Sequence, residues 1–266
     1  FTKKNNELMT TFAKEQVIVD VILPNYNKAE FLEEAINSVI SQSYKNWKLF
    51  IIDDGSEDSS KQVIENYKKN TNVNVIYLSR NKGVAFCRNL GIRLSNSKYI
   101  AFIDSDDYWT QNKLEEQIYF MEKFNYGFTF TNYIPFFLKK EKKIFKKPII
   151  SPNNFNYDQF IHNTSIGMSS VILKRSALGK VKFKNIKICE DYFFKCQILK
   201  KDNLAKNLNK NMMFYRISKN SKQSNKLRNL YWVWYINRNY NRLSLFNNLK
   251  SLLFIIISSI KRYGIK

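Results

Sequence analysis

Apolar runs and amphipathic segments alternate along the first half of the chain. Four runs rich in β-branched residues predict buried strands, and each is followed by apolar residues at helical spacing. The strands are expected near residues 17–24, 47–53, 73–79 and 98–104, and the helices near 29–43, 61–69, 84–95 and 113–124. Strand–helix alternation with short links predicts an α/β fold with a mostly parallel central sheet flanked by helices.

The pattern is less regular after about residue 133. A lysine-rich stretch over 139–147 predicts a solvated hairpin or loop, residues 165–178 predict a strand and the start of a helix, and residues 188–201 predict a helix. In a parallel α/β sheet, ligands bind beyond the carboxyl ends of the strands. The functional site is therefore expected where the strands of the first half end.

Charge divides the chain at about the same place. Residues 1–133 contain 16 Lys and Arg against 17 Asp and Glu, whereas residues 134–266 contain 28 against 5. A strongly basic half indicates a polyanionic partner: nucleic acid, an anionic membrane surface or a phosphorylated substrate. The three cysteines fit neither a disulfide framework nor a zinc site, and they favour a reducing compartment.

An apolar run near the end of the sequence, LLFIIISSI over 252–260, lies between Lys250 and the pair Lys261 and Arg262. The run is shorter than the roughly 20 residues needed to span a bilayer. Two interpretations remain open. The run is either a buried C-terminal helix or an interfacial membrane anchor, because anionic lipids attract flanking cations.

Three carboxylates follow the fourth predicted strand, in the stretch Asp104-Ser105-Asp106-Asp107. Acids here are also common as caps at the start of a helix. One acid suffices for a cap, however, and carboxylates this close repel one another unless a cation lies nearby. Carboxylate oxygens suit Mg²⁺ or Mn²⁺. The cluster therefore predicts a metal site completed by substrate phosphates.

Polar residues also follow the first two strands. Asp53 and Asp54 precede Gly55 and are either turn residues or hydrogen-bond acceptors for a nucleoside. Pro24 and Tyr26 end the first strand, and the Tyr26 ring offers a face on which a base can stack. Each signal is weak alone, but together at neighbouring strand ends they predict a nucleoside pocket.

Two further groups are candidates for this edge of the sheet. Lys82 and Gly83 lead into the predicted helix that contains Arg88, and each cation either faces the nucleotide or forms a structural ion pair. Glu190 and Asp191 are the only adjacent acids in the basic half. A carboxylate there either acts as a general base toward a hydroxyl group or stabilises a helix N-terminus.

In their order along the chain, these stretches resemble the glycosyltransferases of family 2 with the GT-A fold, and within them the SpsA-like bacterial enzymes. The matching stretches are VDVILPNYNKAEFLEEAINSVISQSYKNWKLFIIDDGSEDSS, NKGVAFCRNLGI, YIAFIDSDDYW and CEDYFF. They cover residues 17–109 densely and 165–220 loosely. The ordered set is specific, whereas no single motif is.

The resemblance implies inverting transfer of a sugar from a nucleotide-diphosphate donor, most often a UDP-sugar, to a hydroxyl of a glycan or a polyprenyl-diphosphate-linked glycan. Mn²⁺ or Mg²⁺ is the implied cofactor. By position, the implied donor site comprises Pro24, Tyr26, Asp53, Asp54, Lys82, Gly83, Asp104, Ser105, Asp106 and Arg216, with Asp106 and Asp104 as the DxD metal ligands. Asp191 falls at the position of the catalytic base, and Glu190 would support it.

The implied organisation has four segments: an extension (1–16), a nucleotide-sugar-binding half (17–133), an acceptor-binding half (134–226) and a basic tail (227–266). The implied location is cytoplasmic, on the inner face of a bacterial membrane, where the tail would meet an anionic surface.

One position departs from the family pattern. Many relatives have a histidine after a Tyr-Arg pair in a late loop, whereas Ile217 and Ser218 follow Tyr215 and Arg216 here. If that histidine binds metal in relatives, this chain lacks the ligand or replaces it with water or Ser218. Arg216 would then neutralise phosphate instead.

The main alternative is a module that binds nucleic acid or another polyanion without catalysis, because the basic half interleaves Tyr, Trp and Arg. That alternative leaves the acidic clusters at successive strand ends unexplained, and no nucleic-acid partner is expected. A phosphoacceptor signalling domain fits the Asp104–Asp107 cluster poorly. A sugar-nucleotide-forming enzyme would need a glycine-rich, lysine-bearing loop after the first strand, where none is present.

Overall fold

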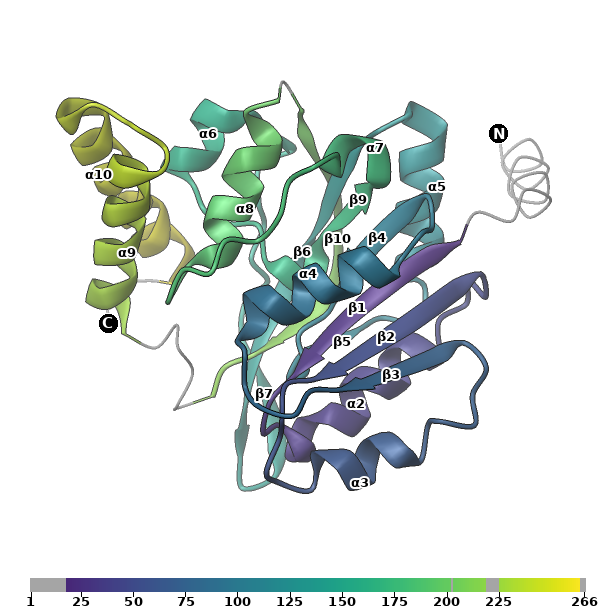
Figure 1. The fold of residues 1–266 in the computed structure, drawn as a ribbon. Coiled ribbons are helices and arrows are strands. Elements are labelled where there is room, and N and C mark those ends of the chain that lie inside the picture. Colours follow the sequence, from purple (N-terminus) through teal and green to yellow (C-terminus); the bar gives the residue numbers. More distant parts are fainter. Residues whose placement is uncertain (1–17, 202, 219–224, 264–266) are drawn as a thin grey trace.

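One mixed sheet with helices on both faces forms the centre of the molecule (Figure 1). The computed structural model describes residues 18–201, 203–218 and 225–263, so the expected extension over 1–16 lies outside the described residues. Within the described ranges the sheet has ten strands, with the main order β3-β2-β1-β4-β9-β6-β10-β5. The predicted α/β class with a helix-flanked sheet is confirmed.

The first half of the chain forms the parallel part of the sheet. Its strands are β1 (Val19–Asn25), β2 (Trp47–Asp53), β3 (Val73–Tyr77) and β4 (Tyr99–Phe102). Its helices are α2 (Ala29–Ile40), α3 (Ser60–Glu65), α4 (Val84–Leu94) and α5 (Lys113–Phe124). Because these strands are parallel, their carboxyl ends meet at one edge, as the sequence predicts.

Alternating side chains of β1 enter two separate cores. Ile22 packs in the core that contains the apolar residues of α4, whereas Val21 and Leu23 pack in the core that contains those of α2. Side chains that alternate along a strand point to opposite faces of the sheet. Both faces are covered here, which explains why Val21, Ile22 and Leu23 form a continuous apolar run rather than alternating with polar residues.

The second half extends the same sheet with antiparallel and parallel pairings. Strand β5 (Tyr108–Trp109) lies in the first half but pairs with β10, and β6 (Phe128–Lys139) crosses from the first half into the second. The other strands of the second half are β7 (Lys142–Phe145), β8 (Asn154–Phe155), β9 (Ile172–Lys174) and β10 (Ala205–Arg216). Its helices are α6 (Tyr157–His162), η1 (Met168–Ser170), α7 (Arg175–Leu178), α8 (Glu190–Leu199), α9 (Lys226–Asn239) and α10 (Leu245–Tyr263).

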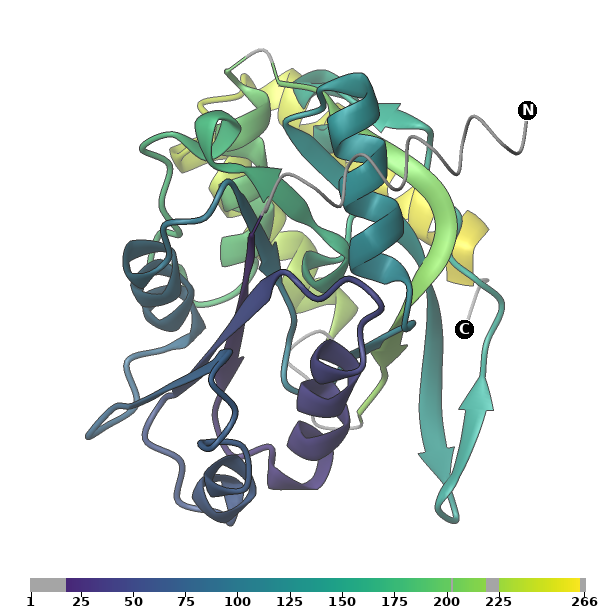
Figure 2. The ribbon, with the colours of Figure 1, turned by 90° about the vertical axis from the view of Figure 1, so that its right-hand side faces the viewer.

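Strands β6 and β10 are the elements that sequence patterns did not predict. They pair in parallel at the centre of the second half, and β6 runs through residue 133, the expected boundary between the two halves. Their sequences combine Asn, Lys and Pro with apolar residues and show no clear alternation. The predicted lysine-rich hairpin is formed by β6 and β7, and it projects from the body in Figure 2, at the lower right.

The chain ends in two helices, α9 and α10, that pack beside α6 and α8 at one side of the sheet (Figure 1). Residues 252–260, which the sequence left as either a buried helix or an interfacial anchor, lie in α10. Ile255 is buried, whereas most of the other apolar residues of this run are exposed. Among the described residues, no helix is both long enough and apolar enough to cross a membrane.

Candidate active site

The ends of β1 and β2 are joined by buried side-chain hydrogen bonds. The Asn25 amide donates to Asp53 Oδ1 at 2.9 Å, and Ser56 donates to Asp53 through both its amide N–H, at 3.1 Å, and its hydroxyl, at 2.6 Å. Asp53 is fully buried. Its carboxylate therefore holds the loop after β2 in place, and its expected contact with a nucleoside remains a prediction.

Asp54 connects this loop to the start of α4. Its two carboxylate oxygens accept hydrogen bonds from the amides of Lys82, at 2.7 Å, and Gly83, at 2.8 Å. Gly83 has a φ of 89°, in a region that favours glycine, and α4 begins directly after it. Lys82 is exposed, with its ammonium group 4.7 Å from the ring centre of Phe86. Asp54 and the Lys82–Gly83 segment are thus in contact, and their expected contacts with the nucleotide remain predictions.

Tyr26, which follows β1, is exposed. Its side chain is 42% exposed, directly after the buried Pro24 and Asn25 of β1. An exposed aromatic ring at the end of a central parallel strand is available to stack on a base. The base-binding assignment of Pro24 and Tyr26 is compatible with this geometry and remains a prediction.

Two acids of the cluster after β4 have cationic partners from the protein. Asp104 pairs with Arg88 at 2.7 Å, and Asp106 pairs with Lys28 at 2.9 Å. From sequence, the repulsion among these acids predicts a bound metal ion. That reason for a metal is wrong, because Arg88 and Lys28, which lie outside the cluster in sequence, supply the compensating charge. Repulsion alone therefore does not demand a metal.

The third acid, Asp107, has a structural role. It is buried and accepts hydrogen bonds from the Ser169 hydroxyl, at 2.6 Å, and from the Arg216 amide, at 3.0 Å. Burial, and then the charges of Asp106 and Asp104, raise its pKa well above the usual value for an aspartate. Asp107 thus joins the loop after β4 to η1 and to the end of β10. Ser105, beside it, is also buried.

Arg216 is held by several protein groups. Its Nε donates to the Asp106 carbonyl at 2.9 Å, its Nη2 donates to Glu34, and its guanidinium lies over the rings of Phe31 and Phe136. The side chain is almost completely buried. These contacts place Arg216 behind the loop that contains Asp104, Asp106 and Asp107, called the acidic loop below. The expected contact of Arg216 with donor phosphate remains a prediction.

Glu190 and Asp191 begin α8. Lys195, one helical turn later, pairs with Asp191 at 2.8 Å and also donates to the Ile166 carbonyl at 2.7 Å. Burial raises the pKa of Asp191, but the charge of Lys195 and its hydrogen bond outweigh burial, so the pKa lies below the usual value. Asp191 is therefore ionised at neutral pH and can accept a proton.

Glu190 faces the acidic loop through Arg88. The Arg88 guanidinium binds Glu190 at 3.0 Å with one nitrogen and Asp104 at 2.7 Å with another. Burial raises the pKa of Glu190, the Arg88 charge opposes this, and Asp191 adds to it, with a net upward shift. One acid of the second half, Glu190, and one acid of the DxD sequence, Asp104, therefore meet across one buried guanidinium.

The residues present fit a divalent cation bound together with phosphate. Asp104 and Asp106 each use one oxygen for an ion pair, and both side chains are partly exposed, at 34% and 22%. Two carboxylates plus substrate phosphates are a common shell for Mg²⁺. Among the described residues, no three His, Cys, Asp or Glu side chains form a complete metal cage.

The position where the chain departs from the family pattern lies just after β10. Ile217 donates its amide to the Phe136 carbonyl there, and residues 219–224 lie outside the described ranges.

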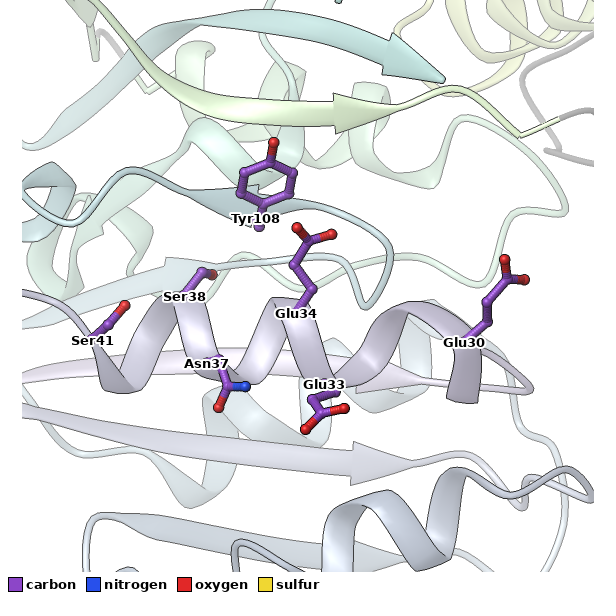
Figure 3. Close-up of a pocket in the computed structure, with 7 residues that line it drawn as sticks. All are labelled: Glu30, Glu33, Glu34, Asn37, Ser38, Ser41 and Tyr108. Atoms are coloured by element: carbon purple, nitrogen blue, oxygen red, sulfur yellow. The ribbon is translucent and has the colours of Figure 1, made fainter. Parts of the chain in front are cut away.

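A hollow of about 530 Å³ lies beside α2 (Figure 3). It is lined by Glu30, Glu33, Glu34, Asn37, Ser38, Ser41 and Tyr108. None of the predicted site residues lines it. Its Glu34 carboxylate pairs with Arg216 and Lys143, so the hollow lies behind the acidic loop rather than over the DxD acids.

Sequence patterns missed several contributing residues. No role was predicted for Lys28 and Glu34, although both lie in a family-like stretch, or for Ser169, because the contacts of all three join distant segments. Lys195 had a usable signal, since it lies four residues after Asp191 on a predicted helix, where opposite charges meet. Arg88 was weighed as either a nucleotide ligand or an ion pair, and the structure shows the ion pair.

The parallel strands of this mixed sheet end at acids and at the exposed ring of Tyr26, and Arg88 joins Asp104 at this edge to Glu190 of α8. The family model "Glycosyl transferase family 2" matches residues 20–181. The chain belongs to this family and is a glycosyltransferase. It is 34% identical over 227 residues to the putative teichuronic acid biosynthesis glycosyltransferase TuaG of Bacillus subtilis, covering 85% of this chain and 89% of TuaG. The predicted family is confirmed.

A second relative is the Escherichia coli protein WfgD, named as a UDP-Glc:alpha-D-GlcNAc-diphosphoundecaprenol beta-1,3-glucosyltransferase. It is 33% identical over 221 residues, covering 83% of this chain and 85% of WfgD. The relation to such enzymes favours catalysis over the alternative of a non-catalytic polyanion-binding module.

Solved structures confirm the GT-A fold. Staphylococcus aureus TarS 1–349 in complex with UDP-GlcNAc superposes with a TM-score of 0.68 at 18% identity, covering 91% of this chain and 72% of that one. The chain spans 43% of the longer TarS structure. The mannosyltransferase PcManGT from Pyrobaculum calidifontis, in complex with GDP-Man and Mn²⁺, gives a TM-score of 0.66 at 14% identity, covering 92% and 70%.

Proposed function

We propose that this glycosyltransferase moves a sugar from a UDP-sugar to a hydroxyl group of a polyprenyl-diphosphate-linked glycan during synthesis of a bacterial surface polysaccharide. The observation that carries the proposal is the Asp104–Arg88–Glu190 bridge, which joins the acidic loop after β4 to the start of α8, where Asp191 follows Glu190. The name of WfgD, with a UDP-glucose donor and a diphosphoundecaprenol acceptor, supports the donor and acceptor classes, and the name of TuaG supports a role in polysaccharide synthesis. We place the reaction on the inner face of the cytoplasmic membrane.

In the proposed reaction, Asp191 accepts the proton of the acceptor hydroxyl as that oxygen forms a bond to the anomeric carbon. The bond from that carbon to the diphosphate breaks on the opposite face, and the departing nucleotide takes the electron pair. Lys195 keeps Asp191 ionised, and Arg88 fixes Glu190 beside it. This arrangement aligns the reacting groups, which is a large part of the catalytic task in such displacements.

The donor is proposed to lie across the carboxyl ends of β1, β2 and β4. The Tyr26 ring would stack on the base, Pro24 and Asp53 would shape its pocket, and Asp54 would hold the Lys82–Gly83 segment beside the diphosphate. Asp104 and Asp106, flanking Ser105, would hold Mn²⁺ or Mg²⁺, which when bound would neutralise charge on the leaving diphosphate. Arg216 would add positive charge behind the loop.

A panel of nucleotide sugars tests the donor assignment. UDP-glucose, UDP-GlcNAc, UDP-galactose and GDP-mannose would be titrated calorimetrically with Mn²⁺, with Mg²⁺ and with EDTA. We expect metal-dependent binding of a UDP-sugar, lost in Asp106→Ala. The exposed acid Asp158 on α6 provides the matched control, Asp158→Ala, which should bind as the wild type does. If no nucleotide sugar binds, the donor assignment is wrong.

Asp191→Asn tests the catalytic base. It should bind the donor as the wild type does and lower transfer to a synthetic prenyl-diphosphate GlcNAc acceptor by about 10²–10⁴-fold, the range typical of general-base catalysis. Asp158→Asn serves as control. Transfer by Asp191→Asn at near the wild-type rate would assign the base to another group and leave the donor site unaffected.

A further inference from the structure

Helix α10 is packed with polar side chains toward the protein. Asn248 and Ser251 are fully buried. The Asn248 amide donates to the Trp234 carbonyl at 3.1 Å, while the Ser251 hydroxyl donates to the Ile161 carbonyl at 2.5 Å and accepts from the Asn237 amide at 3.1 Å. These bonds join α10 to α9 and α6. Hydrogen-bonded contacts of this kind fix the helix in one rotation about its axis.

The opposite side of α10 exposes a stripe of large apolar side chains. Its members are Phe246, Leu249, Leu253, Ile256, Ile257 and Ile260. Spacings of three and four residues place them on one helical face, away from Asn248 and Ser251. Contiguous exposed apolar surface is uncommon on soluble monomers and marks an interaction site. The inward side of the helix thus combines the buried polar residues Asn248 and Ser251 with the buried Ile255, whereas its outward side is apolar and exposed.

Cations border this apolar stripe, and acids are missing from the surrounding sequence. Lys250 and Lys261 are exposed and adjoin the stripe at helical spacing, and Arg238 and Arg242 are exposed on the preceding segment. No Asp or Glu follows Asp202 in the sequence. An anionic surface would therefore meet no opposing charge from α9 or α10.

We propose that the apolar stripe of α10 rests on the surface of an anionic lipid bilayer, with Lys250 and Lys261 at the phospholipid headgroups. An apolar helical face bordered by cations is the pattern of interfacial helices. A second copy of the chain fits the stripe less well, because a symmetric contact would bring identical cations together with no acid to offset them. The lipid contact does not depend on the proposed transfer reaction.

This contact would give the active site a fixed position relative to the membrane. The Tyr192 hydroxyl of α8 donates to Asn237 of α9 at 2.8 Å, and Asn237 in turn binds Ser251 of α10. Asp191 lies at the start of the same helix α8. The catalytic acid pair and the lipid-facing stripe are therefore connected through buried hydrogen bonds.

Vesicle co-sedimentation of the full chain tests the proposal. We expect binding to vesicles of phosphatidylcholine with 30% phosphatidylglycerol at low salt, weaker binding at high salt, and weak binding to phosphatidylcholine alone. Leu249→Asn with Leu253→Asn should lower the partition coefficient by about tenfold or more, because both side chains are more than half exposed, at 55% and 57%, and would enter the interface. Leu94→Asn on α4, at 47% exposure, is the matched control and should bind as the wild type does.

Phe246→Asn is a second variant that spares internal packing, because Phe246 is 75% exposed. It should also weaken vesicle binding. Wild-type protein that stays in solution at low salt, or stripe variants that bind as well as the wild type, would overturn the proposal. If the wild type forms a dimer, the double variant is monomeric and the wild type does not bind vesicles, the stripe would be assigned to contact with a second copy. Donor binding measured on the same samples separates this outcome from a failure of the proposed function.

Discussion

At the residue scale, the buried guanidinium of Arg88 joins carboxylates that are far apart in sequence. It binds Asp104 after β4 and Glu190 at the start of α8. Two carboxylates and one guanidinium in a buried setting are stable only while every charge has its partner, since removal of one partner leaves a desolvated charge. We therefore regard Arg88 as a positioning residue, which sets the distance between Asp104 and Glu190.

Arg88→Lys is expected to keep the charge and lose the bridge. An ammonium is a compact point charge and does not reproduce the planar, two-sided binding of a guanidinium. We expect kcat/KM for transfer to fall at least tenfold, with a smaller loss of thermal stability, and the pH profile to shift as Glu190 loses its partner. Arg93→Lys, at an exposed position of the same helix, is the control. Unchanged kinetics in Arg88→Lys would show that the bridge has no positioning role.

Lys113 predicts a measurable pH dependence of stability. It is fully buried, with its ammonium 4.2 Å from the Trp109 ring centre and bonded to Gln117, and burial lowers its pKa from 10.5 to about 7. Between these pH values the unfolded chain binds a proton that the folded chain lacks. The Lys113 contribution to the free energy of unfolding therefore rises with pH across that window and is least favourable below pH 7.

Lys113→Met removes this titration. In denaturant unfolding, the free-energy difference of wild type minus variant should increase from pH 7 to pH 10, by about 1 kcal/mol per pH unit. Other titrating groups largely cancel in this difference. Lys123→Met, at an exposed position of α5, should show no such slope. A flat difference for Lys113→Met would mean that the buried ammonium keeps its ordinary pKa.

At the scale of elements, a glycine sets how closely α4 approaches the sheet. A Cβ on Gly91 would lie 2.6 Å from Ile22 Cγ2 and 3.0 Å from Ile52 Cδ1. Both neighbours are buried strand residues, on β1 and β2. The close approach matters for the site, because the N-terminal end of α4 carries the segment bound by Asp54 and the helix carries Arg88.

Gly91→Ala should lower the free energy of unfolding by roughly 1–2 kcal/mol, since overpacking costs more than the gain of about 1 kcal/mol in helix propensity. In an Ile22→Ala background the same change should be neutral or stabilising, because the clashing atoms are absent. Denaturant unfolding of the wild type, Gly91→Ala, Ile22→Ala and the double variant gives this comparison as a double-mutant cycle. An equal effect in both backgrounds would reject the steric explanation.

The elements also show where sequence patterns work. The strands of the first half are mostly apolar and end in polar turns, so their positions and their common edge were predictable. Strands β6 and β10 mix Asn, Lys and Pro with aromatic residues, and part of their polar content is bound inside the molecule. Asn207, for example, donates to Asn132 and to the Ser151 carbonyl. Buried polar pairs of this kind remove the alternation by which strands are recognised.

At the scale of the whole molecule, charge and apolar surface are distributed for different partners. The half that holds the proposed donor site is nearly neutral, whereas the second half carries all of the excess positive charge. The proposed lipid-facing stripe belongs to the basic half and lies on α10, which packs against α9 and α6 rather than against the parallel part of the sheet. This arrangement is consistent with a soluble donor reaching one part of the molecule and a lipid-linked acceptor another.

The sequence by itself determined the α/β class, the common edge of the first strands, the family and the candidate acids, because these depend on local periodicity and on short motifs. The tertiary structure alone decided the partners of those acids. Arg88, Lys28 and Lys195 select which carboxylates are paired, and Ser169 makes Asp107 structural. It also decided which face of α10 points outward, because that rotation is fixed by buried bonds of Asn248 and Ser251 to segments distant in the chain.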